Sequence, residues 1–374
     1  MRVYLINNDT SKGDIMDNRD ILMIRDFSNA FGPSGFEEDV ISVIRHYINE
    51  LDLGNVKEDS LRNLYIYRKE NKGNRPIFML DAHSDEVGFI IRAIKADGIL
   101  QFIQLGGWDK LSLPSSKILV RNANGKYIQG VLASKPRQFM NESEREQFKY
   151  DESQLGIDIG ATSKEEAIES FHIRIGEPAA PATKFEINNM GQMWGKAFDC
   201  RIGCVALVET LRRLKNIELP FDVVGVFSAQ EELGDRGCKV AVNRIRPSIA
   251  FCFEGCPADD TFNNEIEAQT VLKEGPMMRF MDRSVLCTPR YQRYVLDLAQ
   301  QKHLKVQCAV RKSGGTNASI INTAYDGIPV VVAGIPVRYI HTCNSLAYYE
   351  DFEATVQLAV ETIRTLTMEV VAKF

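Results

Sequence analysis

Four short apolar runs stand out along the chain and predict buried strands. They lie at residues 77–80, 223–227, 249–253 and 330–333. Runs of this length that are apolar on both faces are typical of central strands in a parallel sheet, because helices then cover both sides. We therefore expect an α/β domain built around them.

Elsewhere in the chain, apolar residues recur at the spacing of a helix. Helices are expected at residues 21–31, 40–48 and 205–214 and from about residue 350 onwards. Before the second helix, Ser34 and Glu37 stand three residues apart, which is the spacing of a capping box. The Gly- and Pro-rich break at 32–35 is interpreted as punctuation between two helices.

The pattern then changes to short alternating runs that are separated by turns. Short strands at such spacing predict a small β-rich domain at residues 90–182. It interrupts an α/β domain made of residues 18–89 and 183–374. Residues 1–17 are polar and without periodicity, so we expect them to form a disordered tail.

Composition narrows the class of protein. A chain of 374 residues with 44% hydrophobic and 25% charged residues is long enough for two globular domains. Its net charge of -5 predicts no nucleic-acid partner. No apolar stretch reaches the roughly 20 residues of a membrane helix, and no basic and apolar leader opens the chain, so we expect no membrane partner and a cytoplasmic location. The eight cysteines form no C-x-x-C pair, which is typical of reduced, buried thiols.

Each of the four runs is followed by side chains of the kind that bind metals. His83 follows the first run, Glu231 and Glu232 follow the second, Glu254 the third and His341 the fourth. Because the carboxyl ends of parallel strands meet at one edge of a sheet, we expect these side chains to converge on one crevice. That crevice is the candidate active site.

The crevice would suit two metal ions. A pair of ions needs a carboxylate that reaches both, a His and another carboxylate for each, and a base that takes a proton from the water between them. Asp199, at an expected strand-to-helix turn, supplies the shared carboxylate. Of the neighbours Glu231 and Glu232, one can face a metal while the other faces the water, since successive side chains near a strand end point in different directions. Asp85 stands two residues after His83 and is placed to orient its ring.

These residues and their surroundings resemble a known family, the tetrahedral or glutamyl aminopeptidases. Its members are co-catalytic dinuclear metallopeptidases, and some of them carry the name cellulase or endoglucanase. The matching motifs lie at 32–35, 82–88, 157–161, 195–201, 230–232, 314–318 and 338–341. Together they span nearly the whole chain from about Asp20.

The resemblance implies a fold and a reaction. The fold is α/β, with a phosphorylase/hydrolase-like three-layer catalytic domain and an inserted small β-barrel-like dimerisation domain. The reaction is the metal-dependent removal of amino-terminal residues from short peptides, by attack of a water that bridges the metals, with Glu231 as general base. The family's pattern places the metal ligands at His83, Asp199, Glu232, Glu254 and His341.

Cofactors and partners follow from the same resemblance. We expect two divalent metal ions per subunit, with Zn as the first choice and Co or Mn as alternatives. The substrates are expected to be short peptides. The subunits are expected to form dimers, which in this family can assemble into a tetrahedral dodecamer.

Three positions depart from the family's pattern. Cys200 stands where a second Asp is common, and Glu254 stands where Asp is frequent. Asn317 replaces the acid of Gly-Gly-Thr-Asp-Ala, and we expect this neutral side chain near the substrate's amino group, where it would change substrate preference. The shared carboxylate at Asp199 is intact, so metal binding should survive.

Two other functions remain open. The same dinuclear chemistry would hydrolyse a related amide such as an N-acyl amino acid, so a deacylase is an alternative. The substitutions at Cys200 and Asn317 would suit a weakly active metal-binding assembly protein, although the intact Glu231 argues against it. A glycosidase would need paired carboxylates around a sugar and has no use for two metal-type His residues.

Overall fold

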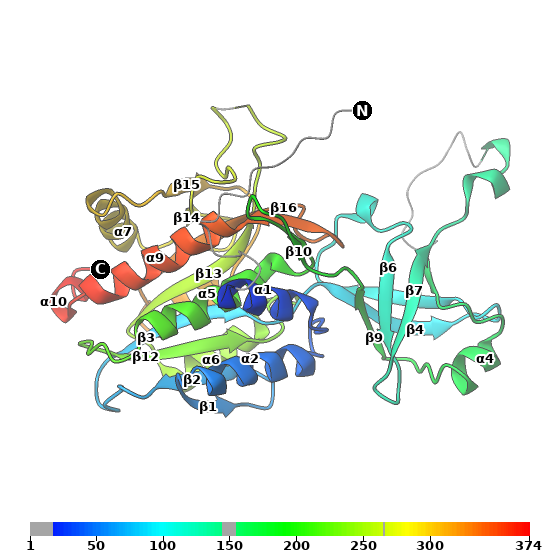
Figure 1. The fold of residues 1–374 in the computed structure, drawn as a ribbon, viewed down its shortest axis with the longest axis horizontal. Helices are drawn as coiled ribbons and strands as arrows, with labels where there is room; N and C mark the ends of the chain where they lie inside the picture. The colour runs from blue at the N-terminus through cyan, green and yellow to red at the C-terminus, as the bar shows by residue number, and fades with distance from the viewer. Residues whose placement is uncertain (1–17, 144–154, 265) are drawn as a thin grey trace, which may run out of the picture.

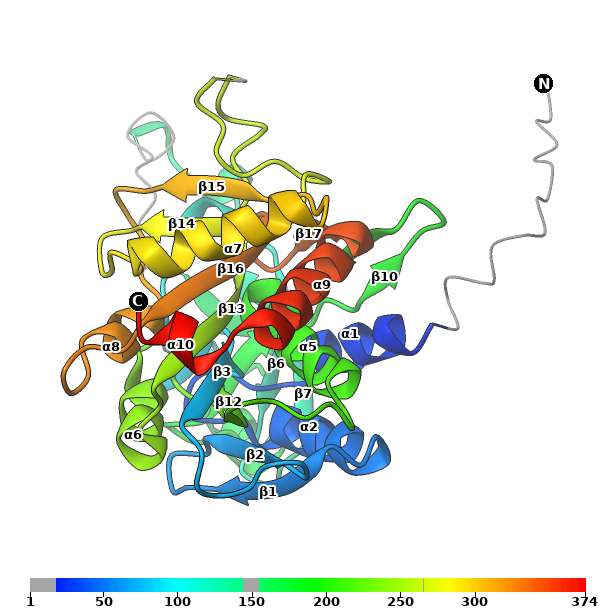
Figure 2. The ribbon, with the colours of Figure 1, turned by 90° about the vertical axis from the view of Figure 1, so that its left-hand side faces the viewer.

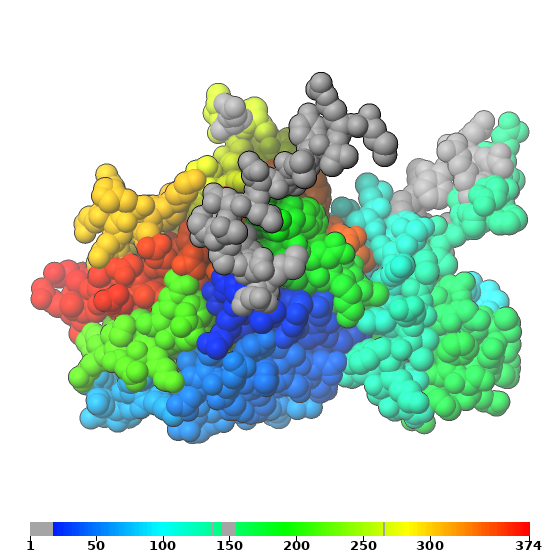
Figure 3. All heavy atoms as spheres, in the orientation of Figure 1, coloured from blue at the N-terminus to red at the C-terminus, as the bar shows by residue number. Residues whose placement is uncertain are grey.

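The computed structural model describes residues 18–143, 155–264 and 266–374 and shows an α/β body with a barrel at one end (Figure 1). The tail expected at 1–17 lies outside these residues. In the space-filling view the barrel projects from the body as a lobe of its own (Figure 3). No helix among the described residues is both long and apolar enough to cross a membrane.

The helices and strands have the following bounds. The helices are α1 (Arg19–Asn29), α2 (Glu38–Glu50), α4 (Lys164–Glu169), α5 (Phe198–Arg213), α6 (Arg236–Ile245), α7 (Pro289–Gln301), α8 (Ala318–Asn322), α9 (Tyr349–Thr365) and α10 (Met368–Val371). The strands of the body are β1 (Gly54–Glu58), β2 (Leu64–Arg68), β3 (Ile77–His83), β10 (Glu186–Ile187), β11 (Gln192–Gly195), β12 (Asp222–Ser228), β13 (Ile249–Pro257), β14 (Met277–Met281), β15 (Gln307–Val310), β16 (Val330–Arg338) and β17 (Ser345–Tyr348). The strands of the barrel are β4 (Gly88–Ile94), β5 (Leu100–Leu105), β6 (Lys117–Arg121), β7 (Tyr127–Ala133), β8 (Gly156–Asp158) and β9 (Pro178–Pro181). The helices expected from apolar spacing are present as α1, α2, α5 and α9.

The body is built on an 11-stranded sheet in the order β1-β2-β12-β3-β13-β16-β17-β11-β10, with β14 and β15 attached beside β16. The four apolar runs form its centre, because β12, β3, β13 and β16 are neighbours and pair in parallel. Their carboxyl ends therefore lie together, as predicted. All four strands run further than the apolar runs. Strand β3 continues to His83, β12 to Ser228, β13 to Pro257 and β16 to Arg338, so His83 and Glu254 lie within strands.

Helices cover both faces of this sheet, which gives three layers. In β3, Phe78 and Leu80 belong to the core formed with α1, α2, α5 and α9, whereas Met79 belongs to the core formed with α6 and α8. Figure 2 shows α5 and α9 over the same side of the sheet. Burial of both faces explains why the central runs are apolar without alternation. The three-layer α/β architecture is confirmed.

The inserted segment closes into a barrel in the order β4-β5-β8-β7-β6-β9. Its interior is filled by fully buried apolar side chains such as Phe89 and Ile157. Phe89 stacks on Trp108, whose indole N–H donates to the backbone oxygen of Gly88 at 3.1 Å. Because β4 begins soon after β3 ends at His83, the barrel starts beside the candidate active site.

The capping box expected from Ser34 and Glu37 is wrong. Helix α2 begins at Glu38, and the Glu37 side chain at its N-cap makes no capping hydrogen bond. Ser34 Oγ instead donates to Asp85 Oδ2 at 2.5 Å, and Glu37 Oε1 accepts from the backbone N–H of Gln230 at 3.2 Å. Both side chains therefore serve the candidate site, where buried polar groups need partners.

The cysteines are unpaired, as expected of reduced thiols. Seven of the eight are buried. Cys308, in the edge strand β15, is exposed and departs from the expectation of buried thiols. Two of the buried thiols, Cys200 and Cys204, belong to α5 beneath the candidate site.

Candidate active site

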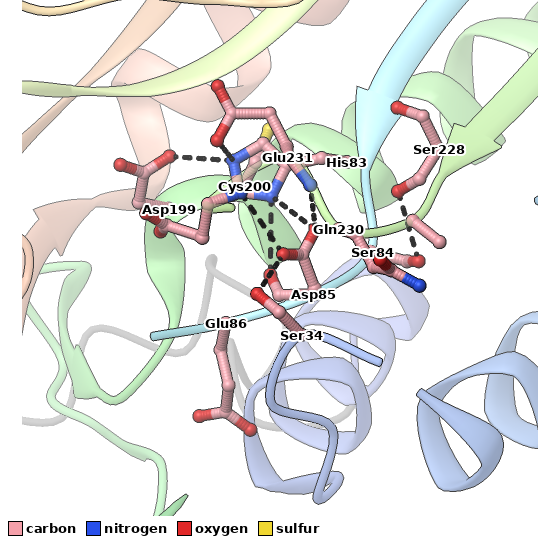
Figure 4. A network of polar contacts seen from close by, with 12 residues as sticks. Ser34, His83, Ser84, Asp85, Glu86, Asp199, Cys200, Ser228, Gln230 and Glu231 are labelled. Carbon is pink, nitrogen blue, oxygen red and sulfur yellow. Dashed lines mark hydrogen bonds and ion pairs between the residues drawn. The ribbon is translucent and has the colours of Figure 1, made fainter. Parts of the chain in front are cut away.

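All six side chains predicted to bind or serve the metals converge at the carboxyl ends of the central strands. They come from β3 (His83), the first turn of α5 (Asp199), the turn after β12 (Glu231 and Glu232), β13 (Glu254) and the loop after β16 (His341). Their ligand atoms, with the thiol of Cys200, form three overlapping groups, and within each group all atoms lie within 4.8 Å of one another. Figure 4 shows Asp199 and Glu231 converging on His83.

Asp199 lies between the two imidazoles. Its Oδ1 is 3.2 Å from His83 Nε2, and its Oδ2 is 3.2 Å from His341 Nε2. Each carboxylate oxygen thus faces a different ring. A side chain placed in this way can reach two metal ions at once, which is the role predicted for it.

Two half-sites share this carboxylate. The inner half-site consists of His83, Asp199 and Glu254, and the outer half-site consists of His341, Asp199 and Glu232. His83 Nε2 lies 3.7 Å from Glu254 Oε2, and His341 Nε2 lies 3.3 Å from Glu232 Oε1. When N and O ligands are about 2.0–2.2 Å from a tetrahedral ion, neighbouring ligand atoms are roughly 3.3–3.6 Å apart. The spacing of each half-site therefore fits one metal ion.

The charge of the site also fits cations. Burial, together with the neighbouring acids, raises the pKa of Glu254 to about 8 and also raises the pKa of Glu231 and that of Glu232. Burial alone would lower the pKa of His341, but Glu232 and Asp199 outweigh it and raise that pKa to about 11. Glu232 Oε1 is buried and makes no hydrogen bond. Crowded acids with an unused oxygen are suited to divalent ions, which bind as the protons leave.

Asp85 holds both the His83 ring and the acid pair in place. Its Oδ1 accepts from the backbone N–H of Glu231 at 2.9 Å, and its Oδ2 accepts from that of Glu232 at 3.2 Å. The same Oδ1 lies 3.4 Å from His83 Nδ1, so the ring is fixed on the side away from Asp199. The carboxylate is fully buried. Asp85 therefore contacts the His83 ring, and its role in orienting a metal ligand stays a prediction.

Glu37 extends this support and was missed in the sequence. Its Oε1 accepts from the backbone N–H of Gly35 at 2.8 Å as well as from Gln230. Gln230 has a φ of 54°, so the turn that carries Glu231 begins with a left-handed residue. Two buried carboxylates thus hold three successive N–H groups of this turn. In the sequence, Glu37 was assigned to a capping box with Ser34, and the adjoining motif at 32–35 was interpreted as punctuation.

A second buried contact, between Glu86 and Lys196, was also missed. Lys196 Nζ donates to Glu86 Oε2 at 2.7 Å, and Arg201 Nη2 lies 3.4 Å from Glu86 Oε1. Glu86 lies just before the first barrel strand, whereas Lys196 and Arg201 flank Asp199. The contact therefore fixes the segment that carries the shared carboxylate to the base of the barrel.

An open cavity of about 360 Å³ lies over the ligands. The residues that line it include the acids and His341, and also Arg279, Arg311 and the segment 313–316. Each guanidinium has an acidic neighbour, at 3.0 Å between Arg279 Nη1 and Asp282 Oδ2 and at 3.5 Å between Arg311 Nη2 and Asp259 Oδ2. The cavity is thus large enough for one end of a short peptide, and both acidic and basic side chains line it.

The expectation that Asn317 lies near the substrate's amino group is wrong. Its side chain is fully buried and does not line the cavity. Asn317 Nδ2 donates to Asp81 Oδ2 and to Ser228 Oγ, both at 2.7 Å. The amide therefore joins β3 to β12 beneath the site.

Comparison with known proteins identifies the family. The sequence profile of the M42 glutamyl aminopeptidases matches residues 63–358. The chain belongs to the M42 glutamyl aminopeptidase family. The glutamyl aminopeptidase of Lactococcus lactis subsp. cremoris (strain MG1363) is 31% identical to this M42 chain over 344 residues, which cover 91% of this chain and 94% of the relative.

Solved structures agree with this assignment. The TET aminopeptidase from the marine sediment archaeon Thaumarchaeota archaeon SCGC AB-539-E09 matches with a TM-score of 0.89 and 34% identity, covering 95% of this chain and 99% of the other. The Pyrococcus horikoshii TET1 peptidase, which can assemble into a tetrahedron or a large octahedral shell, matches with a TM-score of 0.82 and 28% identity over 93% of this chain and 100% of the other.

The M42 assignment confirms the family expected from the motifs. It also confirms the expected class of enzyme, a hydrolase that acts as an aminopeptidase, and the α/β body with an inserted barrel. M42 enzymes are metal-dependent, and the two half-sites supply fitting ligands.

Proposed function

We propose that this M42 enzyme removes amino-terminal residues from short peptides with two divalent metal ions and with Glu231 as general base. The observation that carries the proposal is the position of Asp199, whose two oxygens face two different imidazoles at equal distances of 3.2 Å. Such an arrangement suits a pair of ions better than a single one.

The ions would be held by the two half-sites. His83 and Glu254 would bind one, His341 and Glu232 the other, and Asp199 both. The N and O donors suit Zn²⁺, with Co²⁺ or Mn²⁺ as alternatives. When bound, the ions would polarise the scissile carbonyl and lower the pKa of water at the site.

Glu231 is free to move a proton. Its side chain lines the cavity, and its Oε2 lies 3.9 Å from His83 Nε2. Its backbone is held by Asp85, so the carboxylate does not need a metal to fix its position. Oε2 would take a proton from the attacking water and give it to the departing amine, as a general acid–base group does.

The barrel is proposed to carry the contact between subunits. Several large apolar side chains are exposed on this part of the chain, including Ile103, Leu111, Val131 and Phe139. Exposed apolar groups of this kind are suited to a second copy of the chain. The assembly of the Pyrococcus horikoshii TET1 peptidase into a tetrahedron or an octahedral shell supports contacts between copies of the chain. The dimers and the cytoplasmic location stay predictions.

Assays of matched peptides test the proposed function. Free amino-terminal peptides and their acetylated forms are compared after treatment with a chelator and after return of Zn²⁺, Co²⁺ or Mn²⁺. We expect hydrolysis of the free peptides only, lost with the chelator and restored by an ion. Hydrolysis of N-acyl amino acids instead would show a deacylase. Two bound ions with no hydrolysis of either kind would favour an assembly protein.

A further inference from the structure

Cys200 places a thiol among the ligands of the inner half-site. Ligand atoms of His83, Asp199, Cys200 and Glu254 all lie within 4.8 Å of one another. The thiol is fully buried, and Figure 4 places Cys200 beside His83. The resemblance described above implies an acid at this position, so the sulfur is a departure of this chain from that pattern.

A neighbouring thiol provides a comparison. Cys204 lies one helical turn further along α5, and its Sγ donates to the backbone oxygen of His83 at 2.9 Å. It belongs to none of the ligand groups found among the described residues. Cys200 Sγ also has a backbone partner, the oxygen of Phe253 at 3.2 Å, but it has three metal-type side chains around it as well.

Gly203 leaves space for the sulfur of Cys200. A Cβ built on Gly203 would lie 2.5 Å from Cys200 Sγ and 3.2 Å from Phe253 Cβ. Because Gly203 has no Cβ, the sulfur fits against α5 at this position, and it lies at the same time within the inner ligand group.

We propose that Cys200 is a sulfur ligand of the metal ion in the inner half-site, in addition to His83, Asp199 and Glu254. The inference rests on the proposed dinuclear centre. On binding, the S–H bond breaks, its proton leaves to solvent, and the electron pair of the thiolate is shared with the ion, so no oxidant or reductant is needed. Zn–S bonds are about 2.3 Å long, slightly longer than Zn–O bonds, which suits a ligand at the edge of the group.

A sulfur ligand makes the two half-sites chemically different. Thiolate favours Zn²⁺, Co²⁺ and Cd²⁺, whereas a site of carboxylates and imidazole also accepts harder ions such as Mn²⁺. The inner half-site would therefore select a thiophilic ion. The outer half-site, which has only N and O donors, would remain open to Mn²⁺.

Absorption spectroscopy of the full-length protein loaded with two equivalents of Co²⁺ tests the proposal. We expect a near-ultraviolet sulfur-to-cobalt charge-transfer band in the natural protein, its loss in Cys200→Ser, and its retention in the matched variant Cys204→Ser. Calorimetric titration should also show the ratio of Zn²⁺ to Mn²⁺ affinity at the tighter site falling at least about tenfold in Cys200→Ser.

Three outcomes would overturn the proposal. Two bound Co²⁺ ions without the band would show that Cys200 only packs, while the dinuclear centre stands. A band that survives Cys200→Ser but not Cys204→Ser would assign the sulfur to the other thiol. A natural protein that binds no Co²⁺ would remove the proposed centre and its sulfur ligand together. If Cys200→Ser does not fold, Cys200→Asp replaces it, since an acid is common here in the family, and the same loss of the band is expected.

Discussion

The two half-sites share Asp199 but differ in how their other ligands are held. In the inner half-site, His83 is 1% exposed and Glu254 5% exposed, and both belong to central strands. In the outer half-site, His341 is 32% exposed and lies in the loop after β16, while Glu232 lies in the turn after β12. Backbone held in a sheet on both sides opens less readily than a loop. We therefore expect the inner ion to be tight and the outer ion to exchange.

The acid pair is divided between the two halves in the same way. Glu231 Oε2 approaches His83 Nε2 at 3.9 Å, whereas Glu232 Oε1 approaches His341 Nε2 at 3.3 Å. Adjacent residues in one turn thus serve different halves. This division gives each of them a distinct expected phenotype.

The largest effect is expected from Glu231→Gln. The variant keeps the size of the side chain but cannot take the proton, so kcat should fall by about 10²–10⁴ with metal content unchanged. Steady-state kinetics and elemental analysis check this. The matched variant Glu232→Gln should lose the outer ion as well as activity. If Glu231→Gln is the variant that loses metal, the two assignments must be exchanged.

The next largest effect is expected from Asp199→Asn, which tests whether the half-sites are truly joined. Side chains that merely hydrogen-bond to a metal ligand contribute about 10–100-fold to metal affinity. Asp199 is proposed to bind both ions directly, so loss of its charge should lower the affinity for each ion by more than about 100-fold. Titration with Zn²⁺ by calorimetry measures the two affinities. An Asn variant that keeps one tight ion would show that Asp199 belongs to one half only.

A smaller effect is expected when each imidazole is removed in turn. His341→Ala should retain close to one ion per subunit after dialysis, because the inner ligands are fixed by their strands. His83→Ala should retain less, since in the half-site that stays complete His341 lies in a loop and Glu232 lies in a turn. Elemental analysis of both dialysed variants makes the comparison. Equal retention would mean that burial and strand position do not set metal affinity here.

The central strands and the ligands could be predicted because both depend on local sequence. A strand that is buried on two faces requires an apolar run, which is visible in the sequence. Each of the four runs is followed by a metal-type side chain, so the positions of His83, Glu254 and His341 after these runs predicted that they would lie together. Asp199 was expected to be the shared carboxylate because it stands at a strand-to-helix turn, and the family motif indicated the same residue. The turn alone did not show which strands Asp199 would meet.

The support around the ligands could not be predicted because it depends on contacts between distant segments. The carboxylate of Glu37 meets Gln230 across 193 positions of sequence, and Lys196 meets Glu86 across 110. Local rules instead assigned Glu37 to a helix cap. Similarly, turns and the alternation of apolar and polar residues indicated β structure in the inserted domain. The pairing of β4 with β9, which closes the barrel, depends on packing of the barrel interior and could not be predicted from these local patterns.

The smallest effect on activity is expected from Asn317→Asp, which alters the layer beneath both half-sites. Burial already raises the pKa of Asp81 to about 6, and the introduced carboxylate would lie against it without the amide's donor. Its folded pKa would be raised above the unfolded value of about 3.9, so the folded state binds the extra proton more tightly. Stability should therefore fall as pH rises above that unfolded value, by about 1–3 kcal/mol near neutral pH, because a buried acceptor loses its partner. Urea unfolding of the metal-loaded enzyme at acidic and neutral pH measures this, with the exposed Asn243→Asp as matched control. The aminoacyl substrate profile should stay the same, and a new preference for basic residues would place Asn317 within reach of the substrate after all.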